Sequence, residues 1–97
     1  MTNGQPRQLN IKADDQTLKG VYANSMMVAH SAEEFVLDFV NVLPPQAQLV
    51  SRVITSPGHL KRLIAALTEN LKKYEAAHGQ VEAASEPDRE IGFRPTG

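Results

Sequence analysis

The spacing of the apolar residues changes at Ser56-Pro57, and this change limits the folds open to the chain. Before it, apolar residues run together or alternate, as in β-strands; after it, they recur every three or four residues, as on one side of an α-helix. Ser56 suits the N-cap, Pro57 the first helical position and Gly79 the C-terminal stop. The pattern predicts a helix over residues 57–78, roughly 33 Å long. Its apolar stripe consists of Leu60, Leu63, Ile64, Leu67, Leu71 and Tyr74.

Two strands are predicted directly before this helix. Residues 35–42 and residues 49–55 are rich in β-branched and aromatic side chains, which favour strands. Pro44-Pro45 lies between them and cannot donate hydrogen bonds to a sheet. A connection this short favours an antiparallel hairpin.

Two earlier segments also have strand-like composition. The uncharged apolar run over residues 20–30 favours a strand, and the alternation of apolar and polar residues over 9–12 favours a short edge strand. A turn is expected over residues 14–16 between them. The sequence therefore predicts an α+β fold: an antiparallel sheet of three to four strands followed by one long C-terminal helix.

The chain has 97 residues and a mass of 10.6 kDa, which allow one small domain. We expect that domain over residues 9–79, with a flexible arm at residues 1–8 and a flexible tail at residues 80–97, where apolar periodicity is lost. No apolar run reaches the ~18 residues of a membrane span, so we expect no membrane association. The lack of cysteine excludes disulfides and thiolate metal sites, and it fits a cytoplasmic location.

Both faces of the predicted sheet are apolar, although a single helix can cover only one of them. One face is expected to carry Phe35, Leu37, Phe39, Leu49 and Val53, and the other Val36, Val40, Val42, Val50 and Ile54. In addition, four strands span roughly 19 Å, so a helix of this length overhangs them. We therefore expect an obligate homodimer. The expected interface residues are Val36, Val40, Ile54, Leu67, Leu71 and Tyr74.

Few residues of this chain are candidates for catalysis or metal binding. Asp38 and Arg52 fall opposite each other in the predicted hairpin, and their apolar surroundings favour a structural cross-strand ion pair over a catalytic one. The histidines lie on separate elements, without a carboxylate at metal-ligand spacing; they are His30, His59 and His78. We therefore expect no catalytic residue, no metal and no cofactor. Asn24 and Ser25, within an apolar run, are interpreted as buried hydrogen-bonding residues, since asparagine in a strand often pairs with backbone at a bulge or edge.

The start of the predicted helix has some ingredients of an anion site. Free amide groups at a helix start, with cations nearby, can hold a phosphate. The residues that would contact it are Ser56, His59, Lys61 and Arg62. A single Gly58 does not make the glycine-rich loop of a phosphate cradle, so a solvated helix face is the preferred interpretation.

Four short blocks of this sequence occur together in one family of prokaryotic proteins. They are Tyr22-Ala23-Asn24, Ser31-x-x-Glu34-Phe35-x-Leu37-Asp38-Phe39, Arg52-Val53-Ile54-x-Ser56-Pro57-x-His59-x-Lys61-Arg62-Leu63 and Leu67-x-Glu69-Asn70-Leu71-x-x-Tyr74-Glu75-x-x-x-Gly79. Through these blocks the chain resembles the family called domain of unknown function 3467, over about residues 21–79. The resemblance implies a strand-rich N-terminal half closed by a long helix, and it implies no particular activity.

These features favour a binding protein over an enzyme. We expect a non-enzymatic homodimeric assembly or adaptor module, whose partners are a second copy of the chain and an unidentified protein. One alternative is a nucleic-acid-binding protein of the dimeric sheet-plus-helix kind, against which a net charge of −1 argues. Another is a chaperone-like binder of extended peptides, which would use sheet grooves lined by Met26, Met27 and valines.

Overall fold

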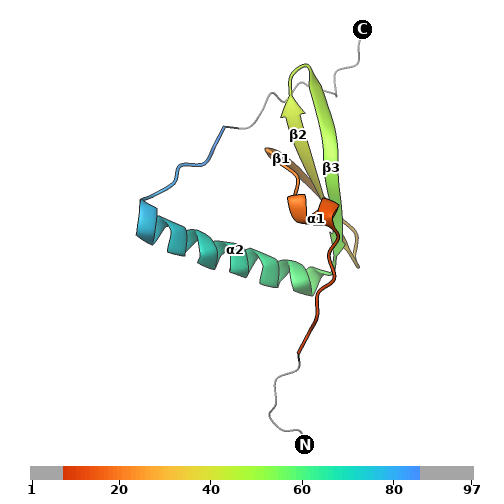
Figure 1. The fold of residues 1–97 in the computed structure, drawn as a ribbon, viewed down its shortest axis with the longest axis horizontal. Coiled ribbons are helices and arrows are strands. Elements are labelled where there is room, and N and C mark those ends of the chain that lie inside the picture. The colour runs from red at the N-terminus through yellow and green to blue at the C-terminus, as the bar shows by residue number, and fades with distance from the viewer. Residues whose placement is uncertain (1–7, 86–97) are drawn as a thin grey trace, which may run out of the picture.

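The computed structural model of the chain describes residues 8–85. Its elements follow in the order α1 (Asp15–Lys19), β1 (Ser25–His30), β2 (Phe35–Leu43), β3 (Gln46–Thr55) and α2 (Pro57–His78) (Figure 1). The three strands form one antiparallel sheet in the order β1-β2-β3. The predicted α+β fold, an antiparallel sheet followed by one long C-terminal helix, is confirmed. Nearly all of the predicted arm and most of the predicted tail lie outside the described residues.

The N-terminal segment differs from the sequence prediction. Residues 9–12 form no strand. Leu9 and Ile11 remain exposed, so pairing with the sheet there would gain no stabilisation from buried apolar surface. In place of a turn over residues 14–16, the short helix α1 begins after Asp14, whose carboxylate accepts a hydrogen bond from the Thr17 backbone N–H at 2.8 Å. The sheet of the described residues therefore has three strands rather than four.

Strand β1 begins five residues later than the apolar run suggests, and Asn24 shows why. Its side chain donates to the Val42 carbonyl at 3.0 Å and accepts from the Val42 N–H at 2.8 Å. Its own backbone N–H donates to the Val40 carbonyl at 3.1 Å. The amide side chain thus occupies the backbone groups of β2 that a longer β1 would use. The interpretation of Asn24 as a residue that pairs with backbone is confirmed, but its expected burial is wrong, because Asn24 is exposed.

The predicted hairpin forms, with one irregularity. Phe39 pairs with Ser51 but Val40 pairs with Leu49, so Val50 is the extra residue of a β-bulge. A shift of one residue moves every following side chain to the other side of the sheet. Leu49 therefore shares a face with Val40, and its predicted place on the opposite face is wrong.

The register defines two faces, because paired residues share a side and successive residues alternate. The aromatic face carries Met26, Val28, His30, Phe35, Leu37, Phe39, Ser51, Val53 and Thr55, and it continues to the hairpin tip through Asn41, Leu43, Gln46 and Gln48. The ion-pair face carries Met27, Ala29, Val36, Asp38, Val40, Leu49, Arg52 and Ile54. The rings of His30 and Phe35, 5.2 Å apart, mark one end of the aromatic face.

Helix α2 has the predicted ends. The Ser56 hydroxyl accepts a hydrogen bond from the His59 backbone N–H at 3.1 Å, as an N-cap does. At the other end, the N–H of Gly79 donates to the Glu75 carbonyl at 2.8 Å. Gly79 has a φ of 95°, which glycine tolerates because it lacks a Cβ. Local chemistry at both ends therefore determines where the helix begins and stops.

The helix does not pack on the sheet of its own chain. The extensive contacts between elements are those of β1 with β2 and of β2 with β3, and α2 extends away from the end of β3 (Figure 1). Among residues 8–85 the one buried residue is Leu37, at 4% exposure. The radius of gyration is 18.0 Å, whereas a compact chain of this length has roughly 12 Å. The assumption that α2 covers one face of its own sheet does not hold.

Candidate interaction surface

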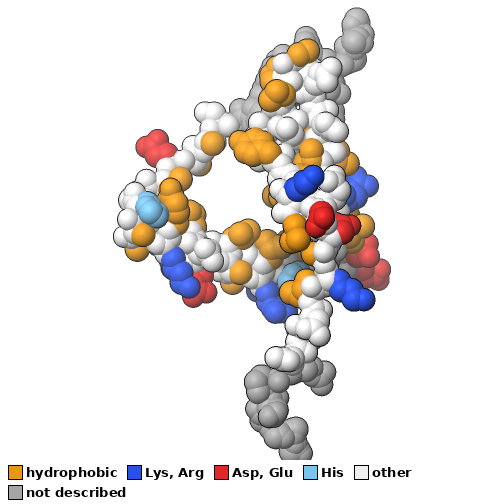
Figure 2. Space-filling model, viewed as in Figure 1, with side chains coloured by type: hydrophobic (Ala, Val, Ile, Leu, Met, Phe, Trp, Pro, Cys, Tyr) orange, Lys and Arg blue, Asp and Glu red, His pale blue; other side chains and the backbone are white. Residues whose placement is uncertain are grey.

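Helix α2 presents its apolar stripe to solvent over most of its length. Leu60 and Leu63, next to the sheet, are partly covered. Farther along, the large side chains of the stripe are about half exposed or more: Ile64, Leu67, Leu71 and Tyr74. Figure 2 shows hydrophobic side chains exposed along α2 and over the strands. A continuous apolar stripe of this length is typical of a surface that meets another surface.

Both faces of the sheet are also open. On the aromatic face, Leu37 is buried between its strand neighbours, while Val28 and Val53 on either side of it are about half exposed. On the ion-pair face, Leu49 and Ile54 are about half exposed. Three of the predicted interface residues lie on this ion-pair face: Val36 and Val40 are half-buried, and Ile54 is exposed.

Asp38 and Arg52 lie opposite each other in the sheet, as predicted. The guanidinium donates from Nε to one carboxylate oxygen at 2.7 Å and from Nη2 to the other at 2.8 Å. The Arg52 side chain is 57% exposed and that of Asp38 14%. The hydrogen bonds from Arg52 hold the pKa of Asp38 below its ordinary value, and the same bonds raise the pKa of Arg52. Because both carboxylate oxygens are engaged, the geometry is that of a cross-strand ion pair.

This pair predicts a specific dependence of stability on pH. The ordinary pKa of an aspartate is 3.8, and that of Asp38 is lower in the folded chain. The ionised carboxylate therefore stabilises the fold fully above the ordinary pKa, and this stabilisation is lost as the pH falls through the lowered one. In urea titrations between neutral pH and pH 2, the free energy of unfolding of the native chain should fall more in acid than that of the Asp38→Asn variant. The Arg52→Gln variant should show the same weaker dependence of unfolding free energy on pH. If both variants keep the pH dependence of the native chain, the assignment is contradicted.

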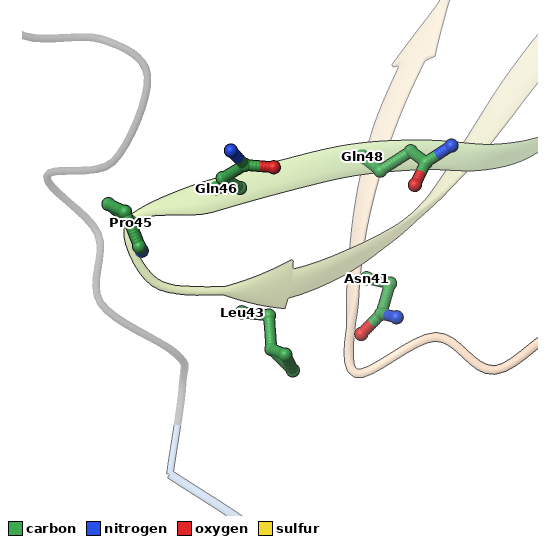
Figure 3. Close-up of a pocket in the computed structure, with 5 residues that line it drawn as sticks. All are labelled: Asn41, Leu43, Pro45, Gln46 and Gln48. Carbon is green, nitrogen blue, oxygen red and sulfur yellow. The ribbon is translucent and has the colours of Figure 1, made fainter.

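A hollow of about 400 Å³ lies at the tip of the hairpin, where the aromatic face ends. It is lined by Asn41, Leu43, Pro45, Gln46 and Gln48 (Figure 3). The Oδ1 atom of Asn41 is buried and has no hydrogen-bond partner in the described part of the chain. A buried acceptor without a donor destabilises a fold, and this oxygen is closed off from solvent by the described residues around it. Sequence reasoning missed Asn41, although a polar residue inside an apolar strand was the available signal.

The predicted anion contact is only partly brought together. Ser56 and His59 are joined by the N-cap hydrogen bond, which uses the hydroxyl and one of the free amide groups. Lys61 and Arg62 are consecutive and so leave the helix axis about 100° apart. The anion contact stays a prediction.

Three remaining features concern a histidine contact, metal binding and membrane-spanning helices. The His78 ring lies against that of Tyr74, at the end of the apolar stripe of α2, with ring centroids 4.7 Å apart and the ring planes tilted by 40°. Residues 8–85 contain no group of three or more side chains suited to hold a metal ion. Over the same residues, no helix combines the length and apolar character needed to cross a bilayer.

The fold and its exposed surfaces define a small α+β protein whose three-stranded sheet is followed by a helix with an uncovered apolar stripe. The chain belongs to the family described as Protein of unknown function (DUF3467), which matches residues 1–83. The resemblance carried by the four sequence blocks is thus confirmed. No curated protein and no solved structure matches the chain.

Proposed function

We propose that this protein is a non-enzymatic interaction module that works as a homodimer. The observation that carries the proposal is that α2 stands away from its own sheet while its apolar stripe is exposed. Burying a leucine side chain contributes about 1.5–3 kcal/mol, whereas ordering the backbone of one residue costs about 1–2 kcal/mol. With Leu37 as the one buried residue among those described, a separate protomer has too little burial to hold its fold.

A second copy of the chain is the simplest source of the missing burial. In a two-fold dimer, if the helix of the first copy packs on the sheet of the second, the helix of the second copy packs on the sheet of the first in the same way. A single kind of helix-to-sheet contact therefore covers both helices. The α2 residues of the expected interface are exposed in the single chain, as such a contact requires; they are Leu67, Leu71 and Tyr74. Dimerisation would leave one sheet face in each copy for a further protein partner, which suits an assembly or adaptor role.

The arrangement of charged groups supports binding rather than catalysis. Each oxygen of the Asp38 carboxylate accepts a hydrogen bond from Arg52, and these bonds lower the pKa of Asp38, which makes it a weaker base than a free aspartate. Ser56, three residues before His59, accepts a hydrogen bond from the backbone N–H of His59 and so caps a helix. Neither arrangement pairs a nucleophile with a base.

Sedimentation equilibrium at micromolar concentration should give twice the chain mass of 10.6 kDa. Because only the dimer is folded, the thermal midpoint should rise with protein concentration. A folded monomer whose midpoint is independent of concentration would overturn the proposal. Salt-dependent retention of single-stranded nucleic acid on a filter would favour the nucleic-acid alternative instead.

A further inference from the structure

We infer that each copy of α2 crosses to the other copy and lies on its aromatic face, so that the two protomers exchange helices. The inference rests on the proposed homodimer and names the two surfaces that meet. The occupant of the aromatic face is thus the apolar stripe of α2 from a second copy of this chain.

The junction between β3 and α2 is too short to let the helix fold back over its own sheet. β3 ends at Thr55 and α2 begins at Pro57, so Ser56 is the whole connection. Its backbone is extended, with φ −83° and ψ 158°, and its side chain is held by the N-cap hydrogen bond. One extended residue before a proline does not reverse the chain, so α2 leaves the end of the sheet instead of folding back over it (Figure 1). Short connections of this kind favour the exchange of an element between protomers.

The distribution of charge selects the face. The strand residues of the aromatic face include no aspartate, glutamate, lysine or arginine. The opposite face carries the pair Asp38–Arg52, in which the Arg52 side chain keeps more than half of its exposure. A helix laid there would remove that charge from water, and such desolvation is costly. On the aromatic face, the same helix would cover Val28 and Val53 beside the buried Leu37.

The lengths of the two surfaces also match. A helix of 22 residues is about 33 Å long, and a strand of nine residues spans about 30 Å. A helix of this length on the aromatic face reaches from the end marked by His30 and Phe35 to the hollow at the hairpin tip.

Cross-linking can test this arrangement, because the chain has no cysteine of its own. Val53 and Ile54 are neighbours near the C-terminal end of β3 that point to opposite faces, and Leu67 lies midway along the stripe of α2. We expect the double variant Val53→Cys/Leu67→Cys, treated with a short bismaleimide, to form a covalent dimer. Its yield should exceed that of the control Ile54→Cys/Leu67→Cys several-fold. A second control, Val53→Cys/Glu69→Cys, places the helix thiol on the side of α2 away from the stripe. Its yield of covalent dimer should be as low as that of the first control.

The outcomes separate this inference from the proposed function. A dimer that cross-links through the Ile54 position would overturn the choice of face and leave the dimer standing. A product cross-linked within one chain would show that α2 folds onto its own sheet, which overturns the exchange. A monomer in sedimentation would overturn both. If a Val53 variant does not fold by circular dichroism, Val28→Cys and Ala29→Cys on β1 provide the same contrast of faces.

Discussion

Replacing Leu67 and Leu71 together by glutamine should dissociate the dimer and unfold the chain. These residues are 63% and 50% exposed in the single chain, so the proposed dimer has a large part of each left to cover. Burying the exposed half of a leucine contributes about 1 kcal/mol, and the dimer contains four such side chains. The loss of about 4 kcal/mol corresponds to a roughly thousandfold rise in the dissociation constant. Sedimentation velocity over a concentration series, with circular dichroism on the same samples, measures both effects.

The matched control changes the opposite side of the same helix. Glu69→Gln with Lys73→Gln makes the same number of substitutions to the same residue, away from the apolar stripe. Opposite charges spaced four residues apart on a helix contribute at most about 0.2–0.5 kcal/mol, so the dimer should persist. If both double variants dissociate equally, helix propensity rather than the stripe is responsible. If neither does, the stripe is not an interface.

Leu37→Ala should be the most damaging single change in the sheet. Leu37 is 4% exposed and pairs with Val28 on one side and Val53 on the other. Truncating a buried leucine to alanine costs about 2–5 kcal/mol, through lost burial and the cavity left behind. Urea unfolding at one fixed protein concentration measures the loss, since the stability of a dimer depends on concentration.

Leu9→Ala is the matched control for this truncation. It removes the same atoms, but Leu9 lies outside every helix and strand of the described residues and is 80% exposed. A substitution at such a site changes stability by less than about 0.5 kcal/mol. Equal losses in the two variants would mean that the centre of the aromatic face is not where the fold buries its apolar surface.

Residue order alone predicts the elements whose causes are local. The helix over residues 57–78 follows from the Ser56 cap, the proline after it, the apolar period and Gly79, all of which act within a few residues. The hairpin and the opposition of Asp38 and Arg52 follow in the same way, since the loop is short and the strands are strongly apolar. The ion pair of the candidate surface was therefore open to prediction.

Contacts between distant residues decided what the periodicity could not. The bulge at Val50 moved Leu49 to the other face, and the side chain of Asn24 ended β1, because each depends on the backbone of a neighbouring strand. The unpartnered oxygen of Asn41 likewise emerges only when the strands are paired. Above all, periodicity shows that α2 has an apolar side but not what covers it. The path of the chain through Ser56 leads α2 away from its own sheet and leaves that side exposed.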